Sequence, residues 1–148
     1  MSHDPIGRLA ADQRAVRDLL DELVEHDDNS MRSELLQRVE RELDVHARIK
    51  QEVIHPALVQ SGGGEDADRQ LRVCEEHYAV ERMLLPDLKR TEPGTPEFAA
   101  RVRAFREMLE QHAREEDDAL FERARSQLTP EQLDELGRSI TARRAQLR

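Results

Sequence analysis

Two pairs of histidine and carboxylate residues in the second half of the chain have the spacing of metal ligands on a helix. His77 is followed four residues later by Glu81, and His112 is followed by Glu116, with Asp117 as an alternative oxygen donor. Residues four apart lie on one face of a helix, so each pair presents a nitrogen and an oxygen in the same direction. Two such pairs on neighbouring helices would supply the donors that a divalent metal ion accepts. The pattern therefore predicts a metal site shared by two helices.

The first half of the chain carries a related pattern in which most of these ligands are replaced. Residues 12–20 resemble residues 76–84, and residues 46–50 resemble residues 112–116, in the same order. The positions equivalent to the four ligands above are occupied by Gln13, Arg17, His46 and Lys50. Only the histidine among them is a common metal ligand, so His46 is a further candidate donor. The two halves are therefore expected to bind metal unequally.

The same residues can also form a polar core that needs no metal. A buried carboxylate requires a neighbouring cation, and Lys50 or Arg17 can take that role beside Glu81 or Glu116. Gln13 can hydrogen-bond to an imidazole or a carboxylate without any metal ion. Both interpretations of these residues stay open at this point.

Apolar residues recur at helical spacing in four long segments, which predict the elements that position the polar residues. The segments cover residues 4–25, about 31–60, about 66–89 and about 95–127, with short turns between them. Thr129-Pro130-Glu131-Gln132 has the spacing of a helix N-terminus, and an amphipathic segment follows it. No segment alternates like a strand. The sequence therefore predicts an all-α fold, an antiparallel up-down-up-down four-helix bundle plus a short C-terminal helix.

One domain is expected to cover residues 1–148, with the bundle at about 4–127 and the C-terminal helix at about 130–147. The C-terminal helix either packs across the bundle or forms an oligomer contact, so we expect a monomer or a homodimer. Its basic stretch, residues 138–148, is interleaved with apolar residues and is expected to form a solvated helix face.

The polar residues fall at similar heights on their predicted helices. His46 and His77 lie at similar distances on either side of the glycine turn at residues 62–64, and Gln13 precedes the first turn by a similar distance. His112 also falls in the middle of its segment. An antiparallel bundle would therefore bring these side chains together at its centre.

The composition disfavours several other classes of function. A net charge of -9 argues against binding to nucleic acids and to anionic membranes, which both require basic patches. No apolar run is long enough to span a bilayer and none resembles a signal peptide, so we expect a cytoplasmic protein. The single cysteine, Cys74, excludes an intramolecular disulfide. The chain shows neither a nucleophile–base pair nor a phosphate-binding glycine loop, and the sequence leaves open whether it is an enzyme.

Four groups of residues form recognisable motifs along the chain. They are Asp4-Pro5-Ile6 with Asp12; Leu43-Asp44-Val45-His46-Ala47 leading to Pro56-Ala57-Leu58; Glu76-His77 followed by Val80; and His112 followed by Glu115-Glu116-Asp117 and Leu120-Phe121. With these motifs the chain resembles the bacterial hemerythrin-like HHE cation-binding family, from residue 4 to about residue 125. The resemblance implies a four-helix bundle with a non-heme di-iron centre. It also implies roles in binding dioxygen or nitric oxide, in iron handling or in peroxide chemistry.

The ligand set that the resemblance implies is incomplete in this chain. The family's first-helix histidine falls on Gln13, and a glutamate that bridges the metals falls on Lys50. The remaining positions carry His46, His77 and His112, with Glu81 where related proteins can have a further histidine and Glu116 or Asp117 as the bridging carboxylate. An ammonium group at Lys50 would repel two adjacent divalent cations strongly at low dielectric.

Three hypotheses about function follow from these patterns. The first is a mononuclear site for iron or another divalent metal, which binds or senses dioxygen, nitric oxide or peroxide or performs limited redox chemistry. The second is a metal-free regulatory or interaction protein whose polar core is closed by ion pairs. The third is a di-iron oxygen-binding protein or oxidase in which other groups replace the missing ligands. An enzyme of this kind would be a non-heme iron oxidoreductase.

Overall fold

The chain is built from helices that follow one another with short links. The computed structural model describes the backbone of residues 5–25 and 29–148, while the side chains of residues 5, 29, 63, 64 and 116–118 lie outside this description. The helices are α1 (Pro5–Glu25), α2 (Asn29–Ile49), α3 (His55–Leu58), α4 (Gly64–Arg90), α5 (Pro96–His112), α6 (Asp118–Gln127) and α7 (Pro130–Leu147). Three π-helical segments, Lys50–Ile54, Val59–Gly63 and Ala113–Asp117, join α2 to α3, α3 to α4 and α5 to α6.

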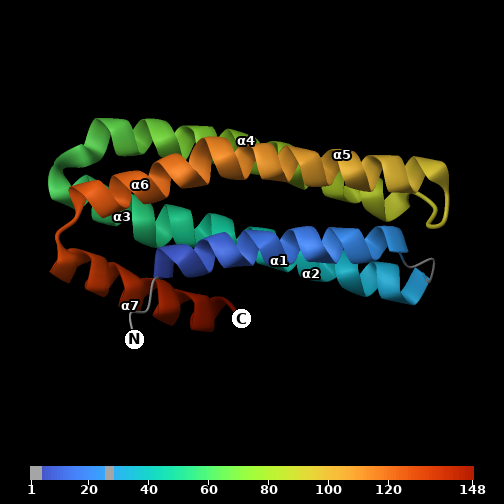
Figure 1. The fold of residues 1–148 in the computed structure, drawn as a ribbon, viewed down its shortest axis with the longest axis horizontal. Coiled ribbons are helices and arrows are strands. Elements are labelled where there is room, and N and C mark those ends of the chain that lie inside the picture. The colour runs from blue at the N-terminus through green and yellow to red at the C-terminus, as the bar shows by residue number, and fades with distance from the viewer. Residues whose placement is uncertain (1–4, 26–28) are drawn as a thin grey trace.

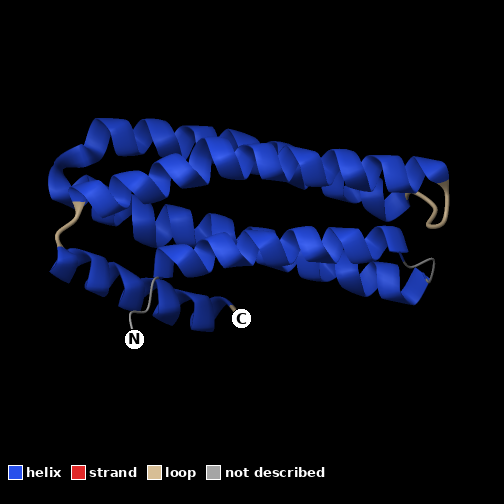
Figure 2. Cartoon of the chain, viewed as in Figure 1, coloured by secondary structure: helices blue, strands red, loops and turns tan. Residues whose placement is uncertain are grey.

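Two of the long arms of the bundle combine several of these elements. α2, the π-helical segment Lys50–Ile54 and α3 continue one another, because Ile49 and His55 keep right-handed helical backbone angles. Gly62, with a φ of 100°, turns the chain into α4. α5, the π-helical segment Ala113–Asp117 and α6 form the last arm, which runs back beside α4 (Figure 1). The described residues contain no strand (Figure 2), and the predicted antiparallel helical bundle is confirmed.

Capping residues explain where two of the helices begin. Oγ1 of Thr95 accepts a hydrogen bond from the backbone N–H of Phe98 at 3.1 Å, and Pro96 follows at the first helical position. Thr129 caps α7 in the same way, with 3.1 Å between its Oγ1 and the backbone nitrogen of Gln132. The side chain of Gln132 in turn accepts from the backbone N–H of Thr129 at 2.9 Å, which completes the expected capping box.

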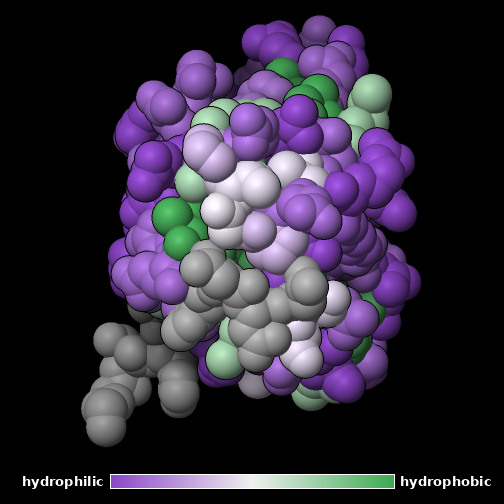
Figure 3. Space-filling model, turned by 90° about the vertical axis from the view of Figure 1, so that its right-hand side faces the viewer, coloured by the Kyte–Doolittle hydropathy of each residue, from purple (hydrophilic) through white to green (hydrophobic). Residues whose placement is uncertain are grey.

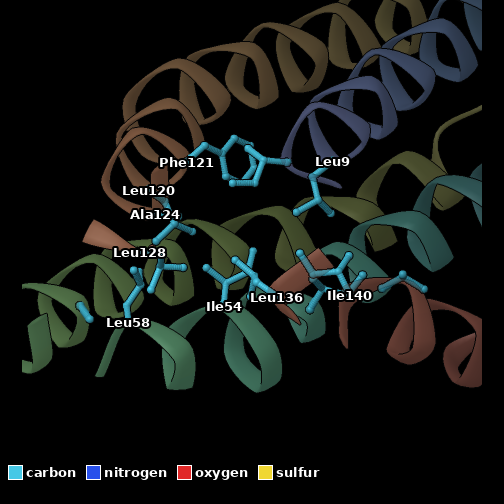
Figure 4. Packing of buried hydrophobic residues seen from close by; sticks show 13 residues of the cluster. Leu9, Ile54, Leu58, Leu120, Phe121, Ala124, Leu128, Leu136 and Ile140 are labelled. Atoms are coloured by element: carbon cyan, nitrogen blue, oxygen red, sulfur yellow. The ribbon is translucent and has the colours of Figure 1, made fainter. Parts of the chain in front are cut away.

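The hydrophobic core consists of two clusters with a polar layer between them. One cluster lies at the end of the bundle that carries the α4–α5 link and includes Phe98 and Phe105. The other lies at the opposite end, where residues of α6 and α7 join it (Figure 4). Leu9 belongs to the second cluster and Val16 to the first, so Gln13 falls between them. The polar layer therefore interrupts the apolar core near the middle of the bundle.

The C-terminal helix α7 lies against α1, α2 and the first π-helical segment. It adds Leu136 and Ile140 to the core, so it packs across the bundle, one of the two arrangements expected from the sequence. The expectation that its basic stretch forms a solvated helix face is wrong for Arg144. This side chain is buried, and its guanidinium binds the carboxylate of Asp12, with 2.5 Å between Nη2 and Oδ2.

One end of the bundle is largely polar in the space-filling view (Figure 3). Hydrophilic side chains cover most of the end that carries the α4–α5 link, with separate small hydrophobic patches among them (Figure 3). Within the described ranges, none of the helices combines the length and the apolarity needed to cross a membrane.

Candidate metal centre

Among the side chains that the structure describes, the polar layer contains those that the sequence predicts for a metal site. Gln13 on α1 lies beside His46 on α2, with 3.4 Å between their Nε2 atoms. Lys50, the first residue of its π-helical segment, is 9% exposed, and Glu81 on α4 is 8% exposed. Two groups that are ordinarily charged are thus withdrawn from solvent in the middle of the bundle. Nearby opposite charges or hydrogen-bond partners must stabilise them there.

Three predicted ligands from the second half of the chain are in contact. Nδ1 of His112, at the end of α5, lies 3.0 Å from Oε1 of Glu81 on α4. The imidazole of His77, one helical turn before Glu81, stacks on that of His112 with 3.9 Å between ring centroids and 5° between ring planes. The structure therefore brings His77, Glu81 and His112 together between α4 and α5, as the repeated histidine–carboxylate pattern predicts.

Burial and neighbouring charges set the protonation of this cluster. Burial raises the pKa of Glu81, whereas the hydrogen bond with His112 and the positive charge of Lys50 lower it. Burial, followed by the proximity of His112, lowers the pKa of His77. The imidazole of His77 is therefore neutral at neutral pH, and the neutral imidazole is the form that binds metal ions.

A cavity of about 310 Å³ adjoins the cluster. Its wall includes Gln13, His46, Lys50, Glu81 and His112, so residues from both halves of the chain face the same space. Cavities that bind small molecules commonly have volumes from about 300 Å³ upwards. The cavity is thus large enough to receive a small molecule beside the histidine and carboxylate groups.

The comparison with known families decides what kind of bundle this is. Residues 4–124 match the family described as hemerythrin HHE cation-binding domain. The chain belongs to this family. The resemblance seen in the sequence motifs is therefore confirmed, and with it the expectation of a hemerythrin-like cation-binding domain. The helix α7 lies beyond the matched residues.

Several proteins resemble this hemerythrin-like chain. It is 29% identical over 139 residues to a protein named DNA nickase from Nostoc sp. (strain PCC 7120 / SAG 25.82 / UTEX 2576). The matched residues make up 94% of this chain and 38% of that protein. The chain is 33% identical over 108 residues to an uncharacterized protein of Mycobacterium tuberculosis (strain ATCC 25618 / H37Rv). Here the matched residues make up 72% of this chain and 63% of that protein. The chain thus spans less than two thirds of either relative. No solved structure matches it significantly.

The hemerythrin-like site offers suitable donor types, but its rings do not converge on one point as they stand. An imidazole binds a metal through a lone pair in its ring plane, and two parallel stacked planes share no such point. Accordingly, the described side chains include no group of three or more His, Cys, Asp or Glu residues arranged around a common centre. Rotation of either His77 or His112 about its side-chain bonds would remove the stacking. The donor chemistry of His77, Glu81 and His112 suits iron, manganese or zinc.

The half of the site that departs from the family has its own partners. Arg17, which the sequence analysis allows beside Glu81 or Glu116, binds Glu110, with 3.1 Å between Nη1 and Oε1. Lys50 is close enough to Glu81 for its charge to lower the pKa of that carboxyl. The two positively charged residues thus both face carboxylates, and neither position supplies a metal ligand.

The π-helical segments are a feature that the sequence analysis did not find. One begins at Lys50 and another at Ala113, directly after His112, so both start beside the site. Single π-helical turns inside α-helices occur frequently at functional sites. The four-residue spacing rule of an α-helix does not hold through residues 113–117. The choice between Glu116 and Asp117, whose side chains lie outside the described part of the structure, stays a prediction.

Sequence reasoning also missed two contacts around the cavity. Tyr78 lines the cavity, and its hydroxyl donates to Oδ1 of Asp44 at 3.1 Å. Tyr78 lies four residues after Cys74, on the face of that helix that the sequence predicts to be buried. This spacing could have identified Tyr78 as a residue that faces the cavity. Asp12 also lines the cavity and is held by Arg144, a contact across the fold with no local signal.

Proposed function

We propose that this hemerythrin-like domain binds one divalent metal ion, preferentially iron, through His77, Glu81 and His112. In the proposal Glu116 or Asp117 completes the ligand set. The observation that carries it is the buried contact between Glu81 and His112, with His77 stacked against it, on the border of the cavity. The cavity beside the site would then receive a small molecule such as dioxygen, nitric oxide or peroxide.

Charge and burial support the proposal of a metal site. Burial disfavours the ionised form of Glu81, and a metal cation beside it would stabilise the carboxylate. Burial also favours the neutral imidazole of His77, which requires no loss of a proton before it binds metal. The family match describes a cation-binding domain, which agrees with this assignment.

The first half of the site supports one ion rather than two. Lys50 stands where the family implies a bridging carboxylate, and Gln13 stands where it implies a histidine. Lys50 is buried, so the protein surrounding it screens its charge weakly. A second divalent ion beside it would meet an ammonium group and would have His46 as its main remaining ligand.

The bound ion would supply an open coordination position for the small molecule. The chain's own residues would position that molecule, because the amide of Gln13 and the ammonium of Lys50 belong to residues on the cavity wall. Both groups are hydrogen-bond donors and would orient an acceptor atom of the ligand.

The DNA nickase name of the Nostoc relative is a weaker guide to function, since the chain spans 38% of that protein and carries a net charge of -9.

A second candidate function is a metal-free interaction or regulatory domain. The observation that favours it is the buried Lys50, whose charge acts on Glu81 and can serve as the counter-charge without a metal ion. In that case the carboxylate would be held by Lys50 and His112 alone.

Metal binding by single-site variants of the full chain separates the two candidates. The protein is produced with iron or manganese supplementation, and bound metal is measured per chain by elemental analysis. His77→Ala and His112→Ala are each expected to lose the metal. His55→Ala is the matched control, because His55 lies away from the cluster and binds Asp68 at 2.7 Å near the surface. Retention of full metal content by both site variants would refute the assigned ligands.

A further inference from the structure

Exposed large apolar side chains gather on one helix of the bundle. Among the described residues there are six of them, and four lie on α4: Val73, Val80, Met83 and Leu84. Val73, Val80 and Leu84 are spaced by seven and four residues, which is the spacing of a seam between two packed helices. Single apolar side chains are ordinary on a protein surface, whereas a stripe of them marks a contact surface. The outer face of α4 is therefore a candidate interface.

The described part of the chain leaves this stripe uncovered. The C-terminal helix α7 packs against α1, α2 and the first π-helical segment, and it lies on the side of the bundle away from α4 (Figure 1). It thus covers the hairpin that the first half of the chain forms. Among the described elements, no equivalent helix lies over α4 and α5 of the second half.

The two ends of α4 carry opposite charges. Its first turn contains acidic residues, Glu65 and Asp66, and its last turn contains basic residues, Lys89 and Arg90. Glu65 lies eighteen residues before Met83 and Arg90 seven residues after it, so all three point to the same side of the helix. Glu65 and Arg90 are both exposed. The apolar stripe is therefore flanked by a negative charge at one end and a positive charge at the other.

The charges and the apolar residues are symmetric about the middle of α4, near residue 78. Three complementary pairs lie equally far from this point on either side, to within one residue: Glu65 with Arg90, Arg69 with Asp87, and Val73 with Met83. When two copies of one helix pack in antiparallel orientation, each residue meets the residue that is equally far beyond the centre. All three pairs would then form twice across a two-fold axis.

The contacts that these side chains make within the chain do not prevent such pairing. Arg69 contacts Asp66 at 3.5 Å and Asp87 contacts Arg101 at 3.7 Å, in pairs that are well exposed to solvent. Exposed pairs of this kind contribute little free energy, so they exchange partners readily. Glu76 falls near the centre of the face, where its charge is offset by Arg72, four residues earlier on the same helix.

We infer that the outer face of α4 binds α4 of a second copy of this chain in an antiparallel two-fold dimer. A two-fold interface requires a surface that complements itself, and the symmetry of α4 about its own centre meets this requirement. A helix of 27 residues is about 40 Å long and forms an interface at the low end of the specific size range. We therefore expect a dissociation constant on the order of 10 µM.

The dimer would place the two candidate metal centres close to its axis. His77 lies within one residue of the centre of symmetry, so the two copies of this residue would stand at the same level on either side of the interface. This consequence rests on the proposed function. The dimer itself depends only on the apolar and charged residues of α4.

Sedimentation velocity of the full chain from about 1 µM to about 200 µM brackets the expected constant. The variant Met83→Glu introduces two carboxylates into the dimer contact and is expected to raise the dissociation constant at least about thirtyfold. The side chain of Met83 is 75% exposed, so this variant keeps its fold, which circular dichroism verifies. Met31→Glu makes the same change at an exposed methionine of α2, away from the α4 face, and is expected to leave the constant unchanged.

Charge reversal tests the antiparallel orientation at low ionic strength, where surface charges are screened least. Glu65→Arg and Arg90→Glu each place like charges opposite one another at both ends of the dimer, and each is expected to raise the dissociation constant about tenfold. The double variant restores opposite charges and is expected to return to within about twofold of the unmodified chain.

Two results would overturn the inference. One is a chain that stays monomeric at about 200 µM or forms an oligomer that Met83→Glu leaves intact. The other is a dimer that the double charge reversal does not restore, which would exclude the antiparallel arrangement. The sedimentation measurements are made equally on protein prepared without metal. Failure of the dimer is therefore distinct from failure of the proposed metal site.

Discussion

The contact between Arg144 and Asp12 allows a quantitative test of how α7 is held on the bundle. The arginine side chain is 5% exposed and the aspartate side chain 23% exposed, with 2.5 Å between Nη2 and Oδ2. The substitution Arg144→Met keeps an unbranched apolar stem and removes the guanidinium group. It therefore leaves the carboxylate of Asp12 partly buried without its cation.

The expected loss of stability lies between two limits. Exposed ion pairs contribute about 0–1 kcal/mol, whereas removal of one partner from a fully buried pair costs about 3–5 kcal/mol. Because Asp12 can rehydrate in part, we expect Arg144→Met to lower the free energy of unfolding by about 2 kcal/mol. For a chain of this length that loss corresponds to a decrease in Tm of about 4–8 °C.

Urea denaturation followed by circular dichroism at neutral pH measures this loss. The matched control is Arg143→Met, because Arg143 binds Glu52 at 2.6 Å in a more exposed pair, with side chains 29% and 37% exposed. This control is expected to change stability much less than Arg144→Met does. A double-mutant cycle with Asp12→Asn isolates the coupling between the two groups. If Arg144→Met costs no more than Arg143→Met, the buried contact does not hold α7 as argued.

Two further outcomes follow from individual contacts. Near-ultraviolet absorbance follows the ionisation of Tyr78 alone, because the chain has one tyrosine and no tryptophan. The midpoint of this titration is expected at a pH of about 12 in the folded chain, against about 10 in the unfolded chain. The folded state holds the phenol proton more tightly than the unfolded state does. The resulting stabilisation of the folded chain is complete below about pH 10 and is lost as the pH rises towards about 12. A folded-state midpoint near pH 10 would contradict the burial of the hydroxyl. Thr129→Ala removes the cap of α7 and is expected to cost about 1 kcal/mol in urea denaturation, whereas Thr141→Ala, at an exposed position inside the same helix, should cost nothing. Equal stabilities of these two variants would show that the cap does not contribute.

Local patterns in the sequence were sufficient to predict the bundle and the composition of its polar layer. Apolar periodicity and the Thr-Pro caps predicted the helices because both signals act within one or two turns. Matched heights along an antiparallel bundle predicted that the polar side chains would come together at its centre, where Gln13 lies beside His46 and Glu81 beside His112. These contacts follow from helix geometry and from the lengths of the arms.

Other contacts depend on rotations and long-range packing that the sequence does not encode locally. The stacking of His77 on His112 depends on side-chain rotation, and the π-helical segments shift the faces of the residues that follow them. The contact of Arg144 with Asp12 arises only when α7 folds back over α1. The stacking and the π-helical segments also determine how the donors of the site are arranged.

The number of metal ions bound per chain tests the central proposal most directly. The full chain and the double variant Gln13→His with Lys50→Glu are each produced with iron supplementation, and iron is counted per chain by elemental analysis and absorption spectroscopy. We expect about one ion in the unmodified chain and about two in the double variant, which restores the ligand types that the family implies. Two irons with an oxo-bridge absorption in the unmodified chain would contradict the argument from Lys50. No bound metal under any supplementation would contradict the proposed site.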